Sequence, residues 1–152
     1  MHHANAIKNG VLTVVSVVGG GVLTLLGGWD RMLQALVVCM AVDFATGVAA
    51  AALGRSDKSR SGRISSRAAL TGLVKKGFEL LVILVAAQLE AATGVGYIRN
   101  AAICFFVGTE GISILENGGQ LGVPLPNAMR RWFEALRERG DTAGDVPWEV
   151  DE

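Results

Sequence analysis

The sequence has little of what an enzyme uses for chemistry. Histidine occurs only as His2 and His3, and the glycine run at 19–21 is not followed by the Lys-Ser or Lys-Thr pair of a phosphate-binding loop. The two cysteines, Cys39 and Cys104, stand in separate apolar runs with no second cysteine or histidine at metal-ligand spacing. We therefore expect no catalytic residues, no cofactor and no metal site, and we predict that the chain is not an enzyme.

Charged and aromatic residues are also scarce. Charged residues make up 18% of the chain, against about 25% in ordinary soluble domains, whereas 51% of the residues are hydrophobic. The net charge is zero, so the chain as a whole has no electrostatic preference for nucleic acid, and we expect no such partner. Only 6% of the residues are aromatic, and the twenty glycines suit helices that pack closely in lipid. The composition predicts an all-α integral membrane protein.

The charges divide the chain into four candidate membrane-spanning segments, because a helix needs about twenty apolar residues to cross the hydrocarbon core. The predicted spans are residues 9–29, 32–54, 77–98 and 100–117. The first two are clearer than the last two, each of which contains two glutamates. We predict four transmembrane helices in a membrane domain of residues 1–126. A three-span alternative omits the first segment and moves the N-terminus outside.

Positive charge gathers between the second and third segments, where Asp57 is the only acid. The basic residues of this predicted cytoplasmic loop are Arg55, Lys58, Arg60, Arg63, Arg67, Lys75 and Lys76. The other two connections are nearly neutral, so the positive-inside rule predicts that this loop and both termini are cytoplasmic. Binding of nucleic acid or anionic lipid is the alternative interpretation of a basic, serine-rich loop.

The last part of the chain is polar. After the breaker "NGGQLGVPLPN", Asn127 is well placed to cap a helix over residues 127–139. Its apolar residues follow helical spacing and are Met129, Trp132, Phe133 and Leu136. We expect an amphipathic helix that lies on the inner membrane surface or packs on a neighbouring subunit, followed by an acidic, disordered tail over residues 140–152.

Small and hydroxyl-bearing residues form a stripe along the first predicted span. They are Thr13, Ser16, Gly20, Thr24 and Gly27. At 100° per residue all five fall on one side of a helix. Such a stripe suits close packing of helices or, in an assembly of several copies, a weakly polar surface that lines water. Both interpretations remain open from the sequence.

Two acids stand near the centres of predicted spans, Asp43 in the second and Glu110 in the fourth. An aspartate at a helix centre costs about 2.5–3.5 kcal/mol on membrane-insertion scales. We expect no lysine or arginine at the depth of these two acids, so each should face the interior of a bundle or a water-filled space. Thr46, Thr109 and Ser113 are the expected neutral partners. Whether the acids line water or only bond to a neighbouring helix stays open.

The two other acids of the third span have basic neighbours. Glu90 is expected to pair with Arg99 across the short outer turn. Glu79 stands within one helical turn of Lys75 and Lys76, and we expect it to pair with one of them.

Three runs of the sequence carry a family resemblance: "GGWDRMLQALVVCMAVDFATGV", "GLVKKGFELLVILVA" and "TEGISILENGGQLGVPLPNAMRRWFEAL". From Gly27 to Leu136 the chain resembles the phage lysis holin and toxin-secretion holin family, of the bacteriophage holin family 4 type. The matches to recurring family positions are Asp43, Gly47, Glu110, Glu116, Asn117, Pro124 and Pro126.

The resemblance implies a small protein of the bacterial cytoplasmic membrane that assembles with copies of itself into pores or lesions. Such lesions let an endolysin reach the cell wall and lyse the host, or let a toxin leave, and no direct contact with that cargo is required. The family is usually described with about three spans, fewer than the four predicted above. Two alternatives remain: a non-lytic ion channel or transporter component that uses the intramembrane acids as a proton path, and a membrane scaffold that recruits a cytoplasmic partner.

Overall fold

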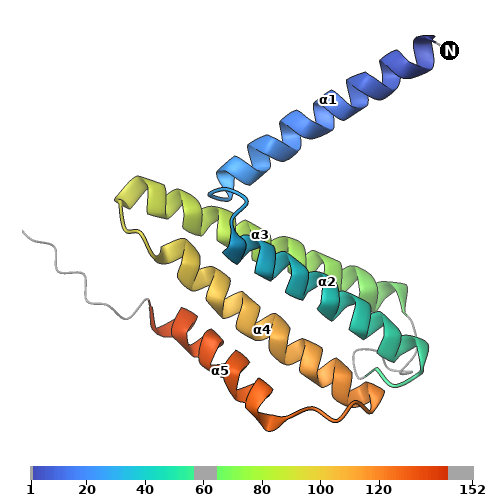
Figure 1. Ribbon diagram of the computed structural model, residues 1–152, viewed down its shortest axis with the longest axis vertical. Helices are drawn as coiled ribbons and strands as arrows, with labels where there is room; N and C mark the ends of the chain where they lie inside the picture. The colour runs from blue at the N-terminus through green and yellow to red at the C-terminus, as the bar shows by residue number, and fades with distance from the viewer. Residues whose placement is uncertain (1, 57–64, 144–152) are drawn as a thin grey trace, which may run out of the picture.

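The computed structural model describes residues 2–56 and 65–143, and every regular element within them is an α-helix (Figure 1). The helices are α1 (His2–Leu25), α2 (Arg31–Ala52), α3 (Ser66–Thr93), α4 (Ile98–Leu121) and α5 (Asn127–Thr142). The predicted all-α fold is confirmed. Lys58, Arg60 and Arg63 of the basic loop lie outside the described residues, as does the predicted tail from residue 144 onward.

Local chemistry explains several of the helix ends. The carboxylate of Asp30 caps α2 by accepting a hydrogen bond of 2.9 Å from the backbone N–H three residues further on. Gly94 and Gly122 end α3 and α4 at φ angles of 74° and 83°, in the left-handed region that favours glycine. The prediction that Asn127 caps the last helix is wrong. Asn127 is the first residue of α5, Pro126 precedes it, and no described side chain caps the helix.

A bundle of three helices forms the centre of the protein (Figure 1). Helices α2 and α4 run in one direction and α3 runs in the other. The central helix is α4, which packs against α2, α3 and α5. The buried apolar core is made by Leu26, Leu33, Leu36, Met40, Ile83 and Ile103. This packing brings side chains from three distant parts of the sequence to the same depth in the bundle.

Helix α1 points away from this bundle (Figure 1). None of its 18 residues from Lys8 to Leu25 is buried, and the side chain of Val17 is 69% exposed. A helix this apolar requires lipid or another helix around it, because so large an exposed apolar surface is unfavourable in water.

Three helices of the described residues are long and apolar enough to cross a membrane. They cover Lys8–Leu25, Arg31–Ala52 and Ile98–Leu121. Helix α3 is longer than any of these, but Lys76, Glu79 and Glu90 interrupt its apolar residues. It also begins before the predicted third span, so that Arg67, Lys75 and Lys76 belong to a helix and not to a loop.

The last helix, α5, lies against α4 and runs in the opposite direction (Figure 1). Met129, Phe133 and Leu136 are half-buried. Trp132 is 67% exposed, and its place on an apolar face that meets the membrane or a neighbouring subunit stays a prediction. The contact line passes through Phe133 and Gly140, and Trp132 lies about 80° from Gly140 around the helix at 100° per residue.

Candidate functional site

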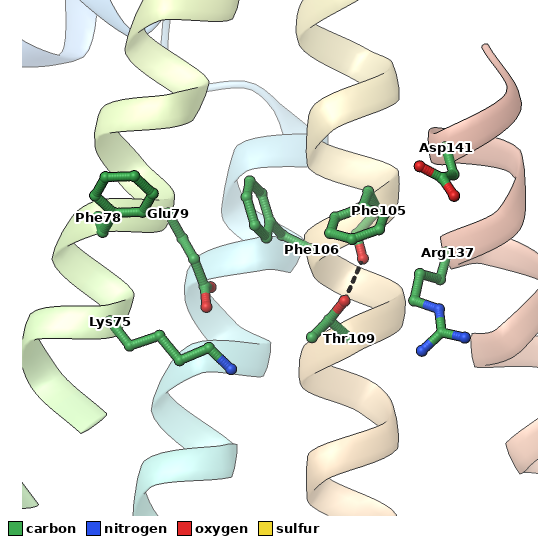
Figure 2. Close-up of a pocket in the computed structure, with 8 residues that line it drawn as sticks. All are labelled: Lys75, Phe78, Glu79, Phe105, Phe106, Thr109, Arg137 and Asp141. Carbon is green, nitrogen blue, oxygen red and sulfur yellow. Dashed lines mark hydrogen bonds between the residues drawn. The ribbon is translucent and has the colours of Figure 1, made fainter. Parts of the chain in front are cut away.

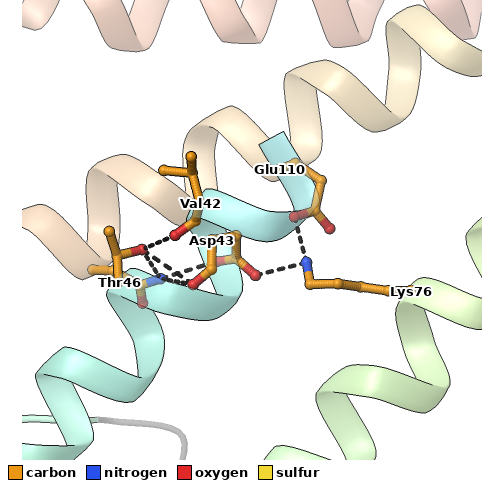
Figure 3. A network of polar contacts seen from close by, with 6 residues as sticks. Val42, Asp43, Thr46, Lys76 and Glu110 are labelled. Atoms are coloured by element: carbon orange, nitrogen blue, oxygen red, sulfur yellow. Dashed lines mark hydrogen bonds and ion pairs between the residues drawn. The ribbon is translucent and has the colours of Figure 1, made fainter. Parts of the chain in front are cut away.

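A buried network of charges joins the three helices of the bundle (Figure 3). The ammonium group of Lys76, on α3, donates to Oδ2 of Asp43 on α2 at 2.8 Å and to Oε2 of Glu110 on α4 at 2.5 Å. The exposed fractions of these side chains are 12% for Lys76, 11% for Asp43 and 3% for Glu110. The prediction that no base lies at the depth of the two acids is therefore wrong. Both acids do face the interior of the bundle, as expected.

An amide completes this network. Nδ2 of Asn117, which is 1% exposed, lies 2.9 Å from Oδ1 of Asp43 and 3.1 Å from Oγ1 of Thr46. Thr46 is thus near Asp43, as predicted, and its hydroxyl donates to the backbone carbonyl oxygen of Asp43 at 3.1 Å. The hydroxyl group of Thr109 donates its hydrogen bond to the carbonyl oxygen of Phe105 at 3.0 Å, and therefore not to Glu110. Asn117 was not predicted as a partner, because nothing in its local sequence shows that it faces Asp43.

The arrangement ties α2, α3 and α4 together through charged side chains. A buried ion pair gains little net stability because removal of its charges from water is costly, but loss of one partner leaves the other charge buried and uncompensated. The network therefore favours one packing of α2, α3 and α4 over others. The described residues contain no group of three or more His, Cys, Asp or Glu side chains that could hold a metal ion.

Glu79 lies next to this network, near Glu110. Its residue is 2% exposed, and neither carboxylate oxygen has a hydrogen-bond partner among the described residues. The predicted pairing with Lys75 or Lys76 is therefore wrong. Glu79 instead lines a groove of about 520 Å³ between α3, α4 and α5 (Figure 2). The other residues of this groove are Lys75, Phe78, Phe105, Phe106, Thr109, Arg137 and Asp141.

A second polar cluster surrounds Arg99 at the other end of the bundle. The guanidinium group pairs with Asp30 at 2.6 Å and also donates to the carbonyl oxygens of Leu26 at 2.6 Å and Gly28 at 3.2 Å. Glu90 does contact Arg99, but it accepts a hydrogen bond of 2.9 Å from the backbone N–H. The predicted ion pair of Glu90 with Arg99 is thus replaced by the pair of Arg99 with Asp30.

Gly27 belongs to this cluster and not to the helical stripe. It lies beyond the end of α1 at a φ angle of 84°, and a Cβ atom there would come within 2.7 Å of Nε of Arg99. The hydroxyl groups of Thr13 and Thr24 donate to carbonyl oxygens within α1, and a Cβ atom at Gly20 would meet open space. The rest of the stripe is exposed, and its role in packing or in lining water remains a prediction.

Acid should weaken the turn between α1 and α2. The hydrogen bond from Arg99 lowers the pKa of Asp30 below the ordinary value for aspartate. Because the pKa of Asp30 is lower in the folded than in the unfolded chain, its interaction with Arg99 stabilises the turn fully at pH values above the pKa of Asp30 in the unfolded chain. This contribution is lost as the pH falls through the lowered value and Asp30 becomes protonated.

Replacement of Arg99 with lysine should loosen the same turn. Lysine retains the charge but lacks the planar fork that reaches one carboxylate and two carbonyl groups at once. An unsatisfied buried carbonyl costs about 1–3 kcal/mol, so we expect a lower thermal unfolding temperature in detergent and faster proteolysis at the turn. Arg31→Lys is the matched control, because Arg31 is an exposed residue beside the same turn. Equal effects of the two substitutions would contradict the assigned role of Arg99.

Apolar helices of spanning length, joined by charges that are hidden among them, define a multi-span helical membrane protein. A model of the bacteriophage holin family matches residues 20–138, and the chain belongs to that family. The resemblance found in the sequence is confirmed.

Relatives of this chain occur in bacteria and in a phage. A probable holin of Bacillus phage phi105 is 31% identical over 115 residues, which are 75% of this chain and 80% of that protein. An uncharacterized 14.9 kDa protein of Clostridium perfringens is 34% identical over 138 residues, or 89% of this chain and 96% of the relative. Another uncharacterized protein, from Clostridium perfringens strain 13, is 34% identical over 119 residues, 77% of this chain and 83% of its own length. No solved structure matches the chain significantly.

Proposed function

We propose that this protein is a phage-type holin that assembles with copies of itself in the bacterial cytoplasmic membrane. The assembly forms lesions through which an endolysin reaches the cell wall, or a toxin leaves, and the host cell lyses. The observation that carries this proposal is the family match over most of the chain, together with the similarity to a probable holin of a phage. Three helices long and apolar enough to cross a membrane support the proposed location.

The proposed topology has four spans and cytoplasmic termini. Helix α3 runs opposite to α2 and α4 (Figure 1), which supports a crossing by α3, because α2 and α4 can run in the same direction through a membrane only if the chain between them returns. Arg55 and Arg67 stand at the connection of α2 and α3, and their charge favours a cytoplasmic position for it. In a single chain surrounded by lipid, α5 lies at the inner membrane surface.

Before assembly, the ion-pair network keeps three charged side chains away from lipid. Assembly into a lesion then supplies water to polar surfaces that a single chain keeps covered. Two carboxylates share one ammonium group in this network, so neutralising one acid leaves a balanced pair.

Glu110→Gln should therefore stabilise the packed bundle and delay lysis. Asp43→Asn should also change the time of lysis. Lysis time is measured by turbidity at equal membrane levels of the variants. Glu116→Gln is the control on the same helix, since Glu116 is exposed. If both Asp43→Asn and Glu110→Gln lysed cells at the same time as the wild-type protein, the network would have no role in lysis.

The function is tested by induction of the protein in a bacterium with and without an endolysin that lacks an export signal. Turbidity and membrane potential are followed together. We expect an abrupt fall in potential in both strains and abrupt lysis only with the endolysin. Slow ion leakage without lysis would indicate a channel, and no change in either quantity would indicate a scaffold.

A further inference from the structure

Helices α4 and α5 approach each other closely because glycines line their contact. A Cβ atom at Gly108 would lie 2.6 Å from the carbonyl oxygen of Phe133, and one at Gly140 would lie 2.5 Å from that of Ala101. A Cβ atom at Gly111 would clash with the ring edge of Phe133. These contacts extend along much of α4, so α5 lies beside a helix of membrane-spanning length and not beyond its end.

The outer surface of α5 is strongly charged. The exposed charged residues of this helix are Arg130, Arg131, Glu138 and Arg139, together with Arg137 and Asp141, whose side chains line the groove beside α4. A charge at the centre of the hydrocarbon core is unfavourable, and this helix would place several there at once. In a single chain surrounded by lipid, α5 therefore cannot stay on α4. The packed arrangement requires water against the outer surface of α5.

The groove beside α5 has the same polar character (Figure 2). Lys75 and Glu79 reach it from α3, and Arg137 and Asp141 reach it from α5. The two positive and two negative side chains line a space of about 520 Å³. Glu79 has no hydrogen-bond partner among the described residues, so a water-filled groove would supply the hydrogen bonds that its buried carboxylate needs.

We propose that α5 packs on α4 in the assembled lesion, and that its charged surface and the adjacent groove line the water-filled lumen. This inference rests on the proposed lesion-forming function. Before assembly α5 lies at the membrane surface, where its charges are hydrated. Assembly brings water to the side of α4, and α5 then docks on the glycines at 108 and 111. The lumen wall of this arrangement carries both signs of charge.

A disulfide between α4 and α5 tests this arrangement. Cysteines at Gly111 and Phe133 remove the ring and bring two Cβ atoms to about the 3.5–4.5 Å that a disulfide requires, since Cγ of Phe133 adjoins the Cβ position at 111. The background is the full chain with Cys39→Ala and Cys104→Ala. Copper phenanthroline is added to cells before and after depolarisation. We expect the cross-link only after depolarisation, because residue 111 is midway along α4 and out of reach of a helix at the membrane surface.

The control pair is Gly119→Cys with Phe133→Cys, because a Cβ atom at Gly119 meets open space. This pair should stay reduced. The cross-linked Gly111 and Phe133 variant, placed in liposomes, should still release a trapped dextran. A cross-link before depolarisation, lesions without a cross-link, or release only after reduction would each overturn the inference. If the background chain neither depolarises cells nor releases dextran, the proposed function itself has failed, and this inference fails with it.

A second pair of variants does not depend on oxidation. Gly111→Leu places a side chain in the space of the Phe133 ring and should keep α5 off α4, whereas Gly119→Leu projects into open space. We expect Gly111→Leu to reach the membrane but to form no lesions, and Gly119→Leu to form them normally. Lesion formation by Gly111→Leu at the level of the control would contradict docking of α5.

Discussion

Replacement of Lys76 with methionine is expected to destabilise the bundle by about 3–5 kcal/mol and to abolish lysis. Methionine has a similar length but no charge, so Asp43 and Glu110 would remain buried without the cation that they share. The carboxylates would then repel each other or require protonation. The measurements are the unfolding temperature in detergent, the amount of protein in the membrane and the time of lysis.

Arg67→Met is the matched control for this substitution. It removes one positive charge from the same helix, but Arg67 is exposed, and we expect a change below about 0.5 kcal/mol. The triple variant Asp43→Asn, Lys76→Met, Glu110→Gln should recover much of the lost stability, because it leaves no buried charge. Equal unfolding temperatures for Lys76→Met and the wild-type protein would show that the network does not hold the three helices together.

Asn117→Asp should have an effect of similar size. The substitution keeps the shape of the side chain but replaces the amide that donates to Asp43 with an acceptor, at a position that is 1% exposed. Two carboxylates would then face each other across α2 and α4, with Glu110 also near the single ammonium group of Lys76. We expect destabilisation of about 3–5 kcal/mol or protonation of one acid, and little protein in the membrane.

Asn100→Asp makes the same chemical change on the same helix. Asn100 is exposed in the first turn of α4, where a negative charge is slightly favourable to the helix dipole. The two variants are compared by unfolding temperature and by lysis time. If Asn117→Asp behaved as Asn100→Asp does, the assigned hydrogen bonds of Asn117 would be wrong.

The sequence contained enough information to place Lys76 beside Asp43, but only if the helix boundaries were known. Asp43 lies nine residues before the end of α2, and Lys76 lies ten residues after the start of α3. In an antiparallel pair these positions have nearly the same depth. The third predicted span begins after Lys76 because a charged residue normally marks a loop, and a lysine that pairs inside a bundle does not follow that rule.

Other features depend on contacts between helices that no local pattern specifies. The periodicity of α5 predicts an apolar face but does not show which part of it meets α4, so the exposure of Trp132 could not be predicted. The glycines at 108, 111 and 140 have meaning only once two backbones are known to approach each other. The all-α membrane class could be predicted, because the length of an apolar segment without charges can be read directly from the sequence.

We propose that the assembly passes a folded enzyme and not only ions. The most direct test follows a tagged endolysin without an export signal, together with membrane potential, after induction of this protein. We predict that the folded endolysin leaves the cytoplasm abruptly when the potential collapses, and that Lys76→Met abolishes both events. A collapse of potential while the endolysin stays in the cytoplasm would contradict the account.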